Sequence, residues 1–198
     1  VAWDDISLNS KNIELTKNSS VFVFGSLICR NMTSRRTLKE LLKIAPFKLF
    51  DINLRSPYYN MNLIEELMLS SDFIKFNYEE IEEISTIYIN KKATLENMIE
   101  TISEKTKTKN ICVTMGEKGA CYYTNNSFYY QDGFKINVLD TVGAGDSFLA
   151  TLVEGILNKT KPQEILKKAC AVAALVASKE GATPAVSMTE INDLLVKK

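Results

Sequence analysis

The chain has 198 residues, of which 24 are lysine or arginine, 24 are aspartate or glutamate and none is histidine. Without histidine it cannot form a Ser-His-Asp triad, a Cys-His dyad or a His-ligated zinc site. Its formal net charge of zero argues against a nucleic-acid-binding surface, so we expect no nucleic-acid partner.

In chain order, the pattern of apolar residues predicts a strand at 20–24, a helix at 33–42, a strand at 47–52, a helix at 63–69, a strand at 72–76, helices at 79–84 and 93–103, a strand at 110–114, a hairpin of strands at 120–124 and 128–131, and helices at 143–158, 162–178 and 189–196. This alternation predicts a mostly parallel sheet with helices on both faces, a three-layer α/β/α arrangement in a single domain over residues 1–198.

Four cysteines, Cys29, Cys112, Cys121 and Cys170, form no C-x-x-C pair, which indicates reduced thiols packed as small apolar groups. No signal-peptide pattern opens the chain. Its longest apolar run, at 169–177, is too short to cross a bilayer. We therefore expect a soluble cytoplasmic protein with no membrane partner.

The stretch most informative about chemistry is D-T-V-G-A-G-D at 140–146, where a loop enters the predicted helix 143–158. Two glycines around a small residue let backbone N–H groups converge, and the first helical turn adds unpaired N–H groups. Such a helix start favours a phosphate group. Asp146, in that first turn, could take the proton of a hydroxyl that attacks a phosphoryl group. The alternative is that the glycines only tighten the turn and Asp146 caps the helix.

This motif resembles the C-terminal signature of the ribokinase-type sugar kinases, the PfkB carbohydrate kinase family. Four further stretches match that family in the right order: D-x-N-x-R at 51–55, as in fructokinases and 2-keto-3-deoxygluconate kinases, N-x-x-E at 77–80, T-x-G-x-x-G at 114–119, and the adenine-closing helix and loop at 168–184. The resemblance implies a ribokinase-like fold. It also implies transfer of the γ-phosphoryl of ATP to a sugar hydroxymethyl group, most like a fructokinase.

For the reacting groups, the resemblance implies that Asp146 is the catalytic base. The backbone N–H groups of Gly143, Ala144 and Gly145 would form the anion hole. Asn77 and Glu80 would organise Mg²⁺ and the phosphates, largely through water. The alternative for this pair is a helix cap followed by a solvated acid.

For the nucleotide, the resemblance implies backbone contacts from the turn that contains Thr114, Gly116 and Gly119, although an ordinary β-turn would look the same. Cys170 and Ser178 would lie near the nucleotide, and Cys170 replaces a polar residue of many relatives, which favours apolar packing there. Asp140 and the carbonyl of Val142 match a monovalent-cation site, for an ion such as K⁺. The alternative for Asp140 is a turn acid.

For the sugar, the resemblance implies contacts from Asp51, Asn53 and Arg55. These residues alternate along a strand end, so we expect their side chains to share one face. A fixed guanidinium suits a phosphate or carboxylate group, whereas the alternative is a surface strand end with an exposed arginine. Arg30 could also face the site, and Trp3 and Tyr58 are expected to be packing residues.

Family members are longer and begin with a half that carries most sugar contacts and a small lid sheet. Nothing in residues 1–19 resembles that half. We therefore expect the C-terminal nucleotide-binding and catalytic part of a kinase, with the lid and N-terminal strands missing and most of the catalysis lost. Since relatives often pair through the lid, a homodimer stays an open alternative.

Three rival interpretations stay open at this point. Kinases of nucleosides, pyridoxal-type vitamins or 2-keto-3-deoxygluconate share the same signature. A non-catalytic nucleotide-binding module would keep the phosphate site without turnover. A dinucleotide-binding oxidoreductase predicts G-x-G-x-x-G after the first strand, but Gly25 stands alone there.

Overall fold

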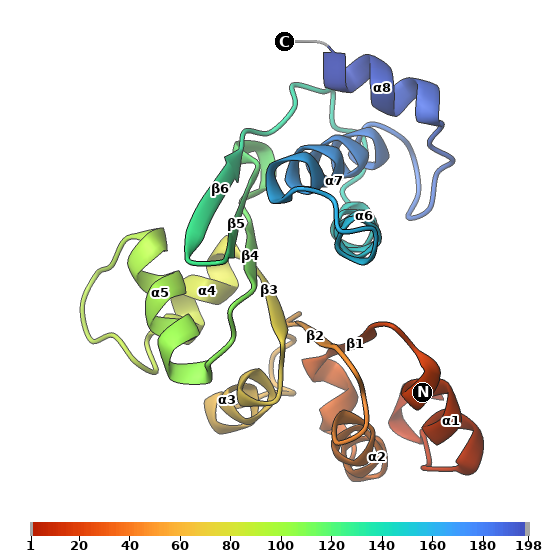
Figure 1. Ribbon diagram of the computed structural model, residues 1–198, viewed down its shortest axis with the longest axis vertical. Helices are drawn as coiled ribbons and strands as arrows, with labels where there is room; N and C mark the ends of the chain where they lie inside the picture. Colours follow the sequence, from red (N-terminus) through yellow and green to blue (C-terminus); the bar gives the residue numbers. More distant parts are fainter. Residues whose placement is uncertain (1, 197–198) are drawn as a thin grey trace. The chain divides into compact units, whose positions relative to one another are not determined.

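A computed structural model describes residues 2–196 and confirms the predicted alternation of strands and helices (Figure 1). In chain order the elements are the short 3₁₀ helix η1 (Ala2–Asp4), α1 (Ser10–Asn18), β1 (Phe22–Gly25), η2 (Ser26–Arg30), α2 (Met32–Leu42), β2 (Lys48–Asp51), α3 (Met61–Leu69), β3 (Phe73–Asn77), α4 (Tyr78–Ser85), α5 (Leu95–Thr106), β4 (Ile111–Thr114), η3 (Gly116–Lys118), β5 (Ala120–Thr124), β6 (Ser127–Gln131), α6 (Ala144–Leu157), α7 (Pro162–Ala177) and α8 (Met188–Val196).

The strands form one sheet in the order β1-β2-β3-β4-β5-β6. β1, β2 and β3 run parallel, with Phe24 opposite Phe50 and Phe50 opposite Ile74. The apolar side chains of β2 and β3 are buried, as the unbroken apolar runs of parallel strands require. The prediction of a mostly parallel sheet is confirmed, and the carboxyl ends of β2 and β3 meet at one edge.

Residue contacts divide the chain into two compact units. Unit 1 comprises Val1–Val113 and Tyr123–Asn126, and unit 2 comprises Thr114–Tyr122 and Ser127–Lys198. In unit 1, α4 packs against β3 and α5. In unit 2, α6 and α7 lie side by side, and α7 also contacts α8 and β6 (Figure 1).

The sequence did not predict α1. Its residues are mostly polar, so no apolar stripe announces a helix, and its start is held by reciprocal bonds between Asn9 and Asn12 instead. The hairpin turn was predicted: Asn125 and Asn126 both have left-handed backbones, with φ of 51° and 57°, as a two-residue hairpin loop requires. Between residues 2 and 196, no helix has the length and apolar content needed to cross a membrane.

Candidate functional site

In unit 2, the D-T-V-G-A-G-D stretch forms the predicted loop and helix start, which we call the helix-start loop (residues 140–146). Gly143 is the N-cap of α6 and has a left-handed backbone with φ of 81°. A Cβ at this position would collide with the carbonyl group of Ala182, whose carbon would lie only 2.7 Å away. Both the dihedral angle and the lack of space therefore require glycine.

Three hydrogen bonds donated by backbone N–H groups close the helix-start loop. The N–H of Val142 donates to Asp140 Oδ1 at 2.9 Å, and the N–H of Ala144 donates to the Thr141 carbonyl at 3.2 Å. The N–H of Ser147 donates to the Gly143 carbonyl at 2.9 Å. The Ala144 N–H, which the family resemblance places in an anion hole, is thus engaged inside the loop. The N–H groups of Gly145 and Asp146 lie in the first turn, where a helix offers them no acceptor.

Asp146 is exposed in the first turn of α6. Among residues 2–196, no other side chain forms a hydrogen bond or an ion pair with its carboxylate. A carboxylate without a cationic partner keeps its lone pairs available to accept a proton. Its place beside the positive end of the α6 dipole also brings it close to any anion bound there.

A cavity of about 670 Å³ lies within unit 2, a size typical of ligand pockets. It brings together residues predicted from three separate stretches, namely Thr114, Gly116, Gly119, Ala144, Gly145 and Cys170. Asp140, Val142, Asp146 and Ser178 are not among its lining residues. The predicted nucleotide turn, the helix start and α7 therefore share one hollow.

The segment between β6 and the helix-start loop was missed by the sequence analysis. Gly133, Phe134, Lys135, Ile136 and Val138 all line the same cavity, although they belong to no helix or strand. Their alternation of apolar and polar residues directly after a predicted hairpin was the available signal. Lys118 and Lys135 add positive charge, and Glu117 adds a negative charge, to a wall that is otherwise mostly apolar.

Cys170 lies in α7 and is 7% exposed. Burial raises the pKa of its thiol to about 12, so the sulfur stays protonated and uncharged at neutral pH. A neutral thiol in a cavity wall behaves as a small apolar group. The structure therefore agrees with apolar packing at this position, which the departure from the family pattern had suggested.

The loop after α7 is tied to α8 by contacts that the sequence analysis also missed. Lys179 Nζ lies 2.6 Å from both Glu190 Oε1 and the Ala185 carbonyl. Glu190 Oε2 accepts the Ser187 N–H at 2.8 Å. Lys179 and Ser187 together lower the pKa of Glu190 to about 2. This loop contains Ala182, the residue against which Gly143 packs.

In unit 1, the predicted sugar-contact residues Asp51, Asn53 and Arg55 lie at and after the end of β2. They do not alternate along an extended strand, because Asn53 has a left-handed backbone with φ of 46°. They are nevertheless joined: Asn53 Nδ2 donates to Asp51 Oδ2 at 2.8 Å, and Arg55 approaches Asn53 Oδ1 at 3.5 Å. Arg55 is exposed, and Asp51 is paired with the buried Lys75.

Asn77 and Glu80 form a capping box at the start of α4. Asn77 Oδ1 accepts the Glu80 N–H, and Glu80 Oε2 accepts the Asn77 N–H, both at 2.8 Å. Glu80 Oε1 accepts the Leu54 N–H at 3.1 Å. The helix-cap alternative is therefore observed for Asn77, whereas Glu80 is buried and not a solvated acid. We call Asp51, Asn53, Arg55, Lys75 and Glu80 the Asp51 cluster.

Residues 2–196 contain no group of three or more cysteine, aspartate or glutamate side chains placed to hold a metal ion. Each oxygen of Glu80 accepts one N–H and keeps a further lone pair. Such an oxygen fits the water shell of a hydrated Mg²⁺ rather than the bare ion.

The guanidinium of Arg30 is bound by neighbouring side chains. It forms a two-bond ion pair with Asp4, with both distances 2.6 Å, and its guanidinium lies over the rings of Trp3 and Tyr58. The hydrogen bonds from Arg30 lower the pKa of Asp4 to about 2. Trp3 and Tyr58 therefore pack on a cation, as the expectation of packing roles allows.

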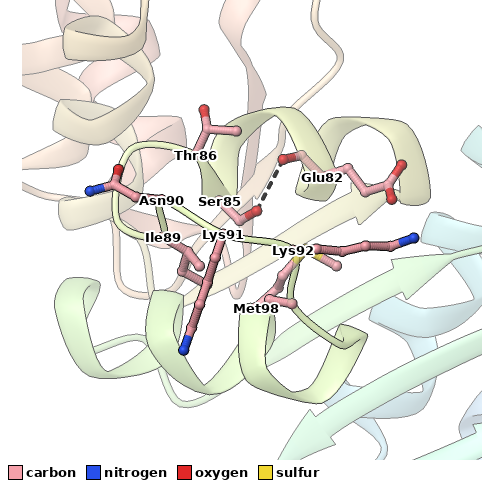
Figure 2. Close-up of a pocket in the computed structure, with 9 residues that line it drawn as sticks. Glu82, Ser85, Thr86, Ile89, Asn90, Lys91, Lys92 and Met98 are labelled. Carbon is pink, nitrogen blue, oxygen red and sulfur yellow. Dashed lines mark hydrogen bonds between the residues drawn. The ribbon is translucent and has the colours of Figure 1, made fainter.

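A second cavity of about 480 Å³ lies in unit 1, beside the loop between α4 and α5 (Figure 2). None of the predicted site residues lines it. Ser85 donates a hydrogen bond to the Glu82 carbonyl at its edge, and the exposed Lys91 and Lys92 come from the loop.

The chain is an α/β protein with a mostly parallel sheet, and the glycine-lined start of α6 is of the kind that favours an anion. The sequence model of the pfkB family carbohydrate kinases matches residues 2–189. The chain therefore belongs to this family, and the predicted ribokinase-like fold class is confirmed.

Individual relatives and solved structures that this chain resembles are also sugar kinases. An uncharacterized sugar kinase of Pyrococcus horikoshii is 32% identical, with 92% of this chain and 58% of the relative covered. Fructokinase-2 of Solanum lycopersicum is 30% identical, with 88% and 57% covered. The structure of a Vibrio cholerae fructokinase with fructose, ADP and calcium has a TM-score of 0.76 at 22% identity, covering 88% of this chain and 60% of that one. The chain spans somewhat more than half of the length of each of these three relatives.

Proposed function

We propose that the whole protein, meaning this chain with any segment that precedes or follows it, is an ATP-dependent sugar kinase of the fructokinase type. The observation that carries the proposal is in unit 2. There the first-turn N–H groups of Gly145 and Asp146, which have no acceptor within the helix, lie at the start of α6, and Ala144 and Gly145 also line a cavity of about 670 Å³. Membership of a carbohydrate kinase family and 30% identity to a fructokinase support the same activity.

In this mechanism Asp146 accepts the proton of a sugar hydroxymethyl group while the hydroxyl oxygen attacks the γ-phosphorus of ATP. The bond between the γ-phosphorus and the bridging oxygen breaks, and ADP leaves. The first-turn N–H groups of Gly145 and Asp146, with the α6 dipole, stabilise the charge that develops on the transferring group. The cavity holds the nucleotide between the Gly116–Gly119 turn and α7, with Cys170 as an apolar wall.

Mg²⁺, when bound, would neutralise phosphate charge, and Asn77 and Glu80 would hold its water shell. A monovalent cation such as K⁺ near Asp140 and the Val142 carbonyl, and a nucleotide contact from Ser178, stay predictions. So do a cytoplasmic location and a homodimer.

A second candidate, an acidic sugar such as 2-keto-3-deoxygluconate, is favoured by Arg55. Its guanidinium is exposed, and its bonds go to the Leu54 carbonyl and to Asn53 rather than to a carboxylate. A carboxylate substrate would suit this arginine better than fructose would.

Changing Asp146→Asn in the whole protein tests the mechanism. We expect sugar-dependent ADP release to fall at least about 100-fold, because a positioned general base contributes that much. ATP binding should stay intact, since Asp146 does not line the cavity. Asp193→Asn removes another exposed carboxylate of unit 2 and should change neither quantity. Turnover of Asp146→Asn near the parental rate would show that the mechanism is wrong.

A substrate panel of fructose, 2-keto-3-deoxygluconate and nucleosides separates the candidates. The highest kcat/KM with fructose supports the fructokinase assignment. A clear preference for the acid sugar supports the second candidate. Nucleotide binding without turnover of any substrate would favour a non-catalytic nucleotide-binding module.

A further inference from the structure

The side chain of Lys75 lies on β3 in a position that ordinarily holds an apolar residue. It is 8% exposed and pairs with Asp51, which is 7% exposed, at 2.9 Å between Nζ and Oδ1. The two residues are opposite each other in the parallel register of β2 and β3. A buried ion pair of this kind costs desolvation free energy, so replacement by two apolar residues would not in general weaken a fold. Stability alone therefore does not account for Lys75.

The other oxygen of Asp51 is linked through Asn53 to Arg55, the residue that we propose contacts the sugar. Asp51 Oδ2 accepts a bond from Asn53 Nδ2 at 2.8 Å, and Asn53 Oδ1 faces Arg55 at 3.5 Å. The backbone around Asn53 is held as well, because Ser26 Oγ donates to its carbonyl at 3.1 Å. Side chains therefore connect Lys75 to Arg55 in a continuous chain of four residues.

The charges of these four bonded side chains suggest what the arrangement does. Asp51 is separated from Arg55 by a single side chain, that of Asn53, and an unpaired carboxylate there would compete for the guanidinium. Lys75 satisfies that carboxylate from the buried side. Arg55 thereby keeps its positive charge directed to solvent and to any ligand that arrives there.

We propose that Lys75 is a positioning residue for the sugar. It fixes Asp51 and Asn53, and it withholds Asp51 from Arg55, so that the guanidinium stays free for an anionic or hydroxyl group of the sugar. The role in sugar binding rests on the proposed function, whereas the effect on Arg55 does not.

The test combines Lys75→Met with the double variant Lys75→Met/Asp51→Asn in the whole protein. Phenylglyoxal modifies free arginine side chains, and peptide mass spectrometry gives the rate at Arg55 relative to the exposed Arg36. In Lys75→Met, Asp51 turns to Arg55, and the relative rate should fall about threefold, the size of an exposed ion pair. The double variant lacks the carboxylate and should recover the parental rate. Lys48→Met, which breaks a partly exposed pair with Asp72, should have no effect.

Sugar kinetics provide the second measurement. We expect the KM for the sugar to rise about tenfold in Lys75→Met, with the KM for ATP changed less than about twofold, because only sugar binding is lost. The double variant has no unpaired buried charge and should be as stable as the parent, and because Arg55 is free again its sugar KM should fall back toward the parental value. This variant also keeps the test decisive where Lys75→Met does not fold.

A sugar KM that stays raised in the double variant while Arg55 reactivity recovers would overturn the proposal, since the Asp51 charge would then not be what weakens sugar binding. Unchanged Arg55 reactivity in Lys75→Met would overturn it too, whether or not the protein phosphorylates sugars. Altered Arg55 reactivity without any sugar turnover would support the positioning role and refute the proposed function instead.

Discussion

The Asp51 cluster of unit 1 and the helix-start loop of unit 2, the two regions where we propose ligand contacts, are built by opposite means. The Asp51 cluster uses side-chain charges: Lys75, Asp51 and Glu80 are buried, and each is bonded to a partner. The helix-start loop uses backbone groups, with a left-handed glycine at the N-cap and unpaired first-turn N–H groups. Of its two carboxylates, Asp140 accepts the Val142 N–H, whereas Asp146 is exposed and forms no side-chain bond among the described residues.

The difference indicates which changes each region tolerates. A buried charge depends on its partner, so the Asp51 cluster is sensitive to removal of a side chain. Backbone dipoles remain after most substitutions, so the helix-start loop is sensitive to added atoms instead. A formal net charge of zero fits both designs, because neither needs an excess of surface lysine or arginine.

The largest expected effect is on the Asp51 cluster. Asp51→Ala leaves the ammonium of Lys75 buried without its carboxylate, and we expect a loss of about 3–5 kcal/mol in the free energy of unfolding. Denaturant unfolding of the variant and the parent measures this. The control is Glu40→Ala, which breaks a pair with Lys43 whose side chains are 49% and 65% exposed. It should cost no more than about 1 kcal/mol. Equal losses in the two variants would contradict the distinction drawn between buried and exposed charges.

The next largest expected effect is the loss of stability and of kcat when an atom is added to the helix-start loop. Gly143→Ala must move the backbone of Ala182 or of Gly143 itself, and we expect about 1–3 kcal/mol of destabilisation. A shift of about 1 Å in the helix start should also lower kcat about 100-fold. Thermal unfolding and steady-state kinetics measure the two losses.

Gly181→Ala is the matched control for stability. Gly181 has nearly the same dihedral angle, φ of 84°, but nothing lies within 4 Å of the Cβ it would gain. Gly181→Ala therefore has the backbone strain without the collision, and it should be more stable than Gly143→Ala. A Gly181→Ala variant as unstable as Gly143→Ala would mean that φ strain, and not packing against Ala182, decides the outcome.

Sequence and structure agree best where the signal is local. The glycines at 143 and 145 and the loop-to-helix position of Asp146 come from seven consecutive residues, so the motif alone predicted them. Lys75 could not be predicted in this way. It sits in an apolar strand, and its partner Asp51 is 24 residues away, so only the register of two parallel strands shows the pair. The cavity wall at 133–138 was missed because its alternation of apolar and polar residues belongs to no helix or strand.

A smaller effect is expected where the cavity of unit 2 is lined by an uncharged thiol. Cys170→Ala removes one buried sulfur, and we expect about 1 kcal/mol of destabilisation, near the centre of the range for point mutations. The KM for ATP should change less than about twofold, because an apolar wall supplies shape and no directed bond. A tenfold or larger increase in that KM, about 1.4 kcal/mol, would mean that the sulfur makes a specific contact with the nucleotide.

The smallest effect concerns the ion pair that ties the loop containing Ala182 to α8. The pKa of Glu190 is about 2 in the folded chain, below its ordinary value of 4.5, because Lys179 and Ser187 stabilise the carboxylate. A lowered pKa in the folded state means that the stabilisation is complete above about pH 4.5 and is lost as the pH falls toward about 2. Glu190→Gln should therefore lower Tm by about 2 °C at pH 7, since an exposed pair contributes little in a chain of this size. The Tm difference between Glu190→Gln and the parent should shrink as the pH falls over that acid range. Thermal melts of both proteins between pH 2 and pH 7 measure this difference. A Tm difference independent of pH would show that the carboxylate charge of Glu190 does not hold the loop.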